Sequence, residues 1–149
     1  MADAPTELSA TMLLCDSAQA VGGKLYVLGA GWTQILMPNT PVPMALAVRI
    51  RVPWDQSNQP FDVHLHLITA EGAPVDQGEG PVEARARMEV GRPPGIRRGA
   101  PLVSVLVLNI GALALPAGSY VWELDIDNVE YAREPFDVLE RPQQQRIGG

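Results

Sequence analysis

Apolar and polar residues alternate one by one along four segments of the chain. A period of two places successive side chains on opposite faces of a β-strand, so that one face packs on a core and the other meets water. The four segments are residues 44–52, 61–67, 82–90 and 120–126. The pattern therefore predicts strands that are each buried on one side.

Clusters of glycine, proline, asparagine and aspartate separate these segments, and no stretch of helical length shows a 3.6-residue period. Many short strands joined by such turns are typical of an antiparallel sandwich rather than of alternating strands and helices. We therefore expect an all-β chain that forms an antiparallel, immunoglobulin-like β-sandwich. Residues 1–140 would form this single domain, and residues 141–149 a polar C-terminal tail.

Two hairpins can be predicted from their turn residues. Residues 8–20 are expected to pair with residues 24–36 through Gly22-Gly23, because glycine adopts the positive φ that tight hairpin turns require. Residues 120–127 are expected to pair with residues 129–139 through Asp127-Asn128. The lead-in to the second hairpin, LPAGSY, is typical of immunoglobulin-like sandwiches.

An apolar run ends in Gly29-Ala30-Gly31, which is how many dinucleotide-binding segments begin. That motif needs a third glycine where this chain has Gln34, followed by a helix that faces the pyrophosphate. Prolines from position 38 onward leave too few residues for such a helix. The sequence instead predicts a strand that bends at the glycines. We expect the aromatic anchors of the core to be Trp32, Tyr120 and Trp122.

Composition narrows the range of partners. The formal net charge of −6 argues against nucleic acid, since no broad basic face is available for phosphates. The acidic N-terminus lacks the features of a signal peptide, and the longest apolar stretch, residues 101–115, is too short for a membrane span. A chain rich in Arg, Ala and Val with a single lysine suggests a bacterial or phage genome. We expect a cytoplasmic protein, or part of a virion or other assembly, with no membrane partner.

The segment LLCDSAQAVGGKLYVLGAGW, together with the closing LPAGSYVWELDIDNVEYAREPFDV, resembles a group of small uncharacterised bacterial proteins. Those proteins share an N-terminal segment of the form LLCD-x-A-Q-x-x-x-G-K-L-Y-x-L-G-x-G-W. The resemblance covers most of residues 13–138, and its first block is the specific part. It implies an all-β fold and brings no activity or site residues.

Catalytic motifs are missing from the sequence. There is no Gly-x-Ser-x-Gly elbow, and the lone Cys15 lies in an apolar strand, where burial opposes thiolate formation. A single cysteine also excludes an intramolecular disulfide and a cysteine-based zinc site. We therefore expect that the protein is not an enzyme.

His64 and His66 are the only histidines, and their i,i+2 spacing puts both on one face of a strand. They could ligate a metal ion if a third ligand came from a neighbouring strand. The sequence identifies no third ligand, so we expect a solvated pair and neither a metal nor a cofactor.

The run PLVSVLVLNIGALAL departs from the alternation, because it is apolar on both faces. A sandwich strand is normally polar on its outer face, so this one needs cover. We expect another chain to supply it, with the contact at Val103, Val105 and Val107. Cover by the N-terminal segment or by the proline loops is the alternative.

The sequence thus predicts a non-catalytic module for protein interaction or assembly, with a protein partner and most simply as a homo-oligomer. The alternative is a structural component of a phage particle or another large assembly. An enzyme, a metal-binding protein and a ubiquitin-like modifier are more remote. The last would use the C-terminal Gly148 and Gly149, in a tail that resembles those of conjugated modifiers.

Overall fold

The computed structural model describes residues 7–140, and β-strands dominate this part of the chain. The only helix in it is a short 3-10 turn, η1 (Trp54–Gln56), and no helix there is long and apolar enough to cross a membrane. The prediction of an all-β chain is confirmed.

The strands are β1 (Ser9–Cys15), β2 (Ser17–Val21), β3 (Lys24–Leu28), β4 (Gln34–Ile35), β5 (Val42–Val52), β6 (Phe61–Thr69), β7 (Glu83–Met88), β8 (Leu102–Leu113), β9 (Gly118–Ile126) and β10 (Val129–Val138). The predicted tail, with Gly148 and Gly149, lies outside the described residues.

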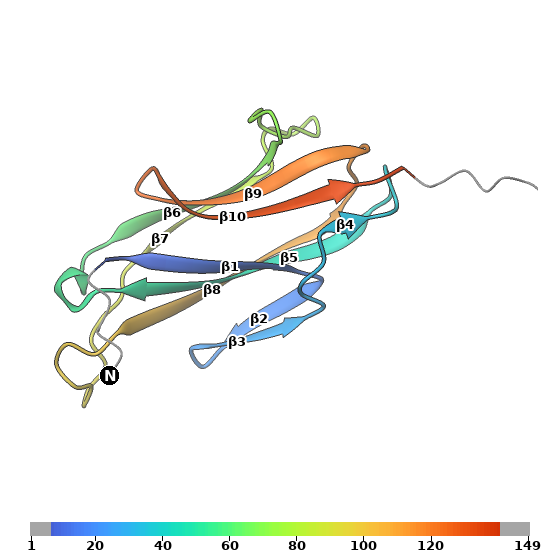
Figure 1. The fold of residues 1–149 in the computed structure, drawn as a ribbon. Helices are drawn as coiled ribbons and strands as arrows, with labels where there is room; N and C mark the ends of the chain where they lie inside the picture. The colour runs from blue at the N-terminus through green and yellow to red at the C-terminus, as the bar shows by residue number, and fades with distance from the viewer. Residues whose placement is uncertain (1–6, 141–149) are drawn as a thin grey trace, which may run out of the picture.

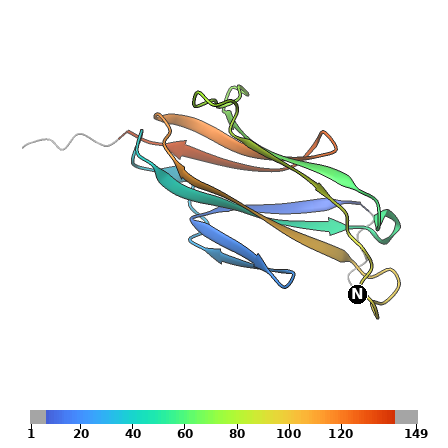
Figure 2. The ribbon, with the colours of Figure 1, turned by 180° about the vertical axis from the view of Figure 1, so that it is seen from behind.

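The strands form two main sheets and one separate hairpin (Figure 1). The first sheet has the order β1-β5-β8, and the second has the order β4-β10-β9-β6-β7. Neighbouring strands are antiparallel, except that β4 pairs in parallel with β10. The hairpin β2–β3 lies beside the first sheet, on the side away from the second (Figures 1 and 2).

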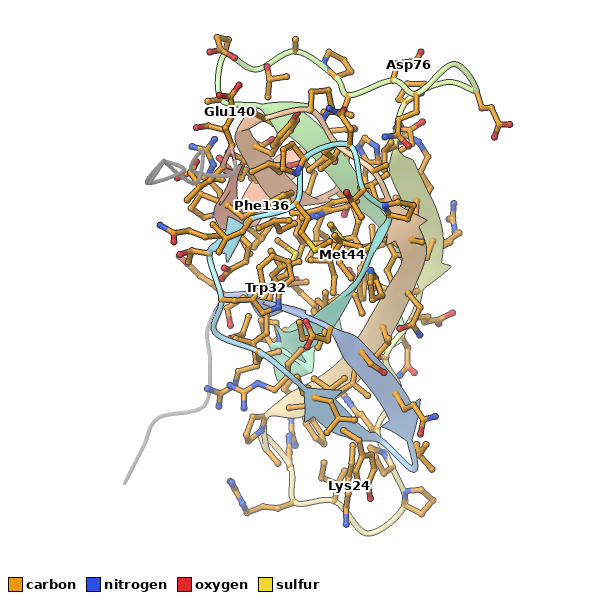
Figure 3. The ribbon with its side chains drawn as sticks, turned by 90° about the vertical axis from the view of Figure 1, so that its right-hand side faces the viewer. Lys24, Trp32, Met44, Asp76, Phe136 and Glu140 are labelled. Atoms are coloured by element: carbon orange, nitrogen blue, oxygen red, sulfur yellow. The ribbon has the colours of Figure 1, made fainter. Side chains whose placement is uncertain are left out.

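The core lies between the two main sheets, and the alternating segments of β5, β6 and β9 supply it as predicted, whereas the inward residues of β7 are only half-buried. Alternate residues of β5, from Met44 to Val52, are buried, and so are those of β6 from Phe61 to Leu67. Trp122 on β9 has no exposed surface. Figure 3 shows Met44 and Phe136 in the interior and Lys24 near the end of the hairpin.

The second predicted hairpin is confirmed. Strands β9 and β10 are joined by Asp127 and Asn128, whose φ angles are 49° and 67°. Aspartate and asparagine tolerate this left-handed region better than most residues. The turn is also tied to β6, because the Asp127 backbone N–H donates to the Asp62 carbonyl at 2.9 Å and an Asp127 carboxylate oxygen accepts from the Asp62 N–H at 2.9 Å.

The first predicted hairpin is right in its turn and wrong in its extent. Gly22 and Gly23, with φ angles of 57° and 74°, join β2 to β3, but the pairing ends at Ser17 and Leu28. At Asp16 the chain turns, and its N–H lies 3.1 Å from the carbonyl oxygens of both Leu28 and Gly29. Strand β1, which precedes this turn, pairs with β5 instead.

Because of that turn, the hairpin packs on the outer face of the first sheet as an additional layer. A small second core forms there from Cys15, Ala18, Ala45 and Ala47, and Leu25, Val27 and Val107 pack against it. Small side chains allow the two layers to approach closely. Burial raises the pKa of the Cys15 thiol, which lies 3.4 Å from the Ala45 carbonyl oxygen.

The aromatic anchors differ in burial. Trp122 and Tyr120 are buried, as predicted, whereas Trp32 is only half-buried. Gly29 and Gly31 both have positive φ, so the chain does bend there, and the bend brings the Trp32 ring edge-on to Phe136 with centroids 6.1 Å apart. Trp32 therefore packs at the margin of the core rather than within it.

Candidate functional site

The three valines expected at an interface lie together on the outer face of the first sheet. The register between β5 and β8 sets Val103 opposite Arg51, Val105 opposite Arg49 and Val107 opposite Ala47. The valine face therefore continues across the sheet as two arginines and one alanine.

The hairpin β2–β3 covers one end of this valine face. Val107 packs against the small core beneath the hairpin, Val105 is half-buried, and Val103 is 47% exposed. The chain folds back at Asp16 and itself supplies part of the cover of Val107, and the contact of the three valines with another chain stays a prediction. Val105 lines a hollow between β8 and the hairpin, and Val103 is the most exposed of the three valines.

Strand β8 lies at the edge of its sheet. Within the described residues it pairs with β5 alone, so the backbone groups on its other side have no strand partner. Its twelve residues include no charged side chain. By contrast β7, which forms an edge of the second sheet, carries Glu83, Arg85 and Arg87.

The two main sheets are open along β8. On the other side β1 lies against β10, but beside β8 the inward-facing Leu106, Leu108 and Ile110 are only half-buried. A cavity of about 180 Å³ opens there, and it is lined mainly by Val63, Leu65, Ala84, Ala86, Leu106 and Leu108. A shallow hollow of about 550 Å³ lies on the outer side of β8, between this strand and the hairpin, and includes Ala18, Val21, Val105 and Val107. Hollows thus flank the unpaired edge on both sides, and Gln19 and Asn109 give the outer one a partly polar lining.

A second candidate site lies on the outer face of the other main sheet, where His64 and His66 project from β6. Their rings are stacked, with centroids 4.3 Å apart and planes within 6° of parallel. Nε2 of His66 lies 3.0 Å from Oδ2 of Asp125 and 3.4 Å from Oε2 of Glu123. Nε2 of His64 lies 2.6 Å from Oε2 of Glu83, and its Nδ1 lies 4.0 Å from Oδ2 of Asp125.

Strand register brings these side chains together. His64 lies opposite Asp125 of β9, and His66 lies between Glu123 of β9 and Glu83 of β7. The hydrogen bond with His64 is the main reason that the pKa of Glu83 lies below its usual value. Around these groups, Arg85 lies near Glu83 at 3.8 Å, and Arg133 contacts Oε1 of Glu123 at 3.2 Å.

Asp125 is therefore the candidate third ligand that the sequence did not identify. One ligating atom each from His64, His66 and Asp125 lies within 4.8 Å of the others. The alternation of apolar and polar residues already places Glu123 and Asp125 on the polar face of one strand, and the two histidines on the polar face of another. What was missing was the knowledge that β6 and β9 are neighbours, since His66 and Asp125 are 59 positions apart.

The comparisons with known proteins give a family and no activity. No curated protein matches the chain at a significant level. A family model matches residues 10–139, a range that includes both main sheets and the hairpin. The chain thus belongs to DUF6941, a family of unknown function.

Proposed function

We propose that the chain is a non-catalytic, immunoglobulin-like β-sandwich that associates with a second copy of itself through the free edge of β8. The observation that carries the proposal is that this twelve-residue edge strand has no charged side chain and no strand partner on its outer side within the described residues.

The immunoglobulin-like assignment is supported by Tyr120. Its hydroxyl donates to the carbonyl oxygen of Pro116, four residues earlier, at 2.7 Å. A tyrosine near the start of a strand that bonds back to the preceding backbone is a recurrent feature of immunoglobulin-like sandwiches. The packing of two mainly antiparallel sheets around one core agrees with that architecture.

Unprotected edge strands are rare in monomeric proteins, because their free N–H and C=O groups form a template for another strand. Charged residues, prolines, bulges and short length are the usual protection. Strand β7 is protected by its charges, and β4 has two residues. Strand β8 has only a bulge near Gly111, where the register with β5 shifts, and the stretch before it is regular.

A second copy fits this edge because the pairing can be self-complementary. Two β8 strands related by a two-fold axis would pair antiparallel and join the three-stranded sheets of both copies. Val103 and Val105 would then line the contact on the outer face, and Leu106 and Leu108 would line it on the inner face. Full burial of an exposed side chain of this kind contributes roughly 1.5–3 kcal/mol, and the half-buried members of this set would contribute less.

The proposal is tested by the substitution Val105→Glu. The introduced carboxylate lies beside the edge on the outer face and is expected to convert a dimer into a folded monomer, because it cannot be buried against an apolar strand without a large desolvation cost. Light scattering measures the mass, and circular dichroism checks that the chain stays folded.

Val129→Glu is the matched control. Val129 is 57% exposed and lies at the β9–β10 turn, on the other main sheet. This variant is expected to remain dimeric. A wild-type chain that is monomeric throughout the micromolar range, or a dimer that both variants leave intact, contradicts association through β8.

A further inference from the structure

The histidine–carboxylate cluster brings two kinds of metal ligand to one point. Two imidazole rings come from β6, and the carboxylates of Glu123 and Asp125 come from β9. In a four-coordinate site with bonds of about 2.0–2.2 Å, neighbouring ligand atoms lie about 3.4 Å apart. The distances from Nε2 of His66 to Asp125 and Glu123, 3.0 and 3.4 Å, are close to this value. Because a metal lies in the plane of each imidazole that binds it, the two stacked rings must turn out of their parallel arrangement to share one ion.

We propose that His64, His66 and Asp125 bind one divalent transition-metal ion, with Glu123 as the fourth ligand. The side chains of the three core ligands are about four-fifths buried, so they are held in place by their neighbours while one side of the site stays accessible. The ion would join β6 to β9 across the outer face of the sheet. Such a site is independent of the β8 edge, which belongs to the other sheet.

The contact between Glu83 and His64 supports this assignment. Metal-binding histidines usually donate the N–H of the second ring nitrogen to a carboxylate, which fixes the orientation of the ring. Here Nε2 of His64 lies 2.6 Å from Glu83, so Nδ1 is the nitrogen with the free lone pair. Nδ1 is also the atom that lies nearer Asp125, at 4.0 Å.

The chemistry of the donor set selects the class of metal. Imidazole nitrogen suits Zn²⁺ and the related first-row ions, whereas Mg²⁺ and Ca²⁺ prefer sites made of oxygen alone. At His66 the ion would bind Nε2 on the side of Asp125, and the neutral ring would then carry its one proton on Nδ1. Arg133 contacts Oε1 of Glu123, which leaves Oε2 directed to His66.

A network of ion pairs is the alternative account of the same cluster. The contacts of the cluster can also form without a metal, because imidazole N–H groups can donate to the carboxylates of Glu83 and Asp125. A titration with metal separates the two accounts.

The experiment is calorimetric titration of Zn²⁺ into the full chain, purified without an affinity tag and treated with a chelator. We expect one Zn²⁺ per chain and no displacement by excess Mg²⁺. His66→Ala and Asp125→Asn are each expected to weaken binding at least about tenfold. Zn²⁺ should also shift the imidazole resonances of both histidines in the wild-type nuclear magnetic resonance spectrum.

Asp62→Asn is the matched control, because Asp62 lies on the same face of β6, two residues from His64, and is paired with Arg87 instead. Its affinity for Zn²⁺ should equal that of the wild type. The proposal is overturned if the wild type takes up no stoichiometric Zn²⁺, if all three variants bind it as the wild type does, or if Mg²⁺ displaces it. If a variant fails to fold, the wild-type chain still tests the proposal. Zn²⁺ must then shift the imidazole resonances of both histidines, and unchanged resonances overturn it.

Discussion

Replacing Trp122 with alanine is expected to lower the free energy of unfolding by about 3–5 kcal/mol, the usual cost of truncating a buried large aromatic side chain. Trp122 is fully buried between the two main sheets, where it belongs to the main core. The substitution removes its apolar contacts and leaves a cavity that β9 cannot close without breaking its pairing with β6 and β10. Urea unfolding followed by circular dichroism measures the loss.

Trp32→Ala is the control for this prediction, because Trp32 is less buried than Trp122. Trp32 is half-buried at the margin of the core and contacts Phe136 edge-on. Less apolar surface is buried there, and solvent can fill the space, so the expected cost is about half as large. Equal costs for the two substitutions would place Trp32 within the core and contradict the described packing.

Gly29→Ala is expected to lower the free energy of unfolding by about 2–3 kcal/mol, for two reasons. The φ of Gly29 is +68°, a region that residues with a Cβ atom rarely adopt. An added Cβ would also lie 2.6 Å from Cγ of Asp16 and would push that side chain away from the turn that starts the hairpin. Thermal unfolding measures the effect.

Gly22→Ala separates the two causes. Gly22 also has positive φ, +57°, but an added Cβ would meet no atom within 4 Å. Its expected cost is therefore only the conformational one, about 1 kcal/mol. If the two variants lose the same stability, the Asp16 side chain gives way freely and the close approach of Asp16 to Gly29 does not hold the hairpin.

The strands that the sequence predicts best are those with one buried face. Alternation locates most of β5, β6, β7 and β9, because a strand's two-residue period is a local property. The β9–β10 hairpin is equally local, since the Asp127-Asn128 turn lies between the two pairing segments. These elements need no knowledge of the rest of the chain.

The parts that the sequence did not predict depend on contacts between distant residues. Apolar residues occur on both sides of Asp16, and no glycine or proline lies next to it to mark a turn. The local sequence therefore does not show that β1 separates from the hairpin and pairs with β5. The same turn creates the third layer and covers Val107, which changes the extent of the expected interface. Asp125 joins the two histidines only because β9 is the neighbour of β6.

Association through the β8 edge is tested most directly by amide hydrogen exchange, resolved by residue with nuclear magnetic resonance, at low and high protein concentration. In residues 103–109 the amides that point away from β5 have no strand partner among residues 7–140 of one copy. We expect these amides to exchange quickly in dilute solution and to become protected as the concentration rises, and to stay fast in Val105→Glu. If they exchange equally fast at both concentrations in the wild type, no second strand pairs with β8 and the proposed association is wrong.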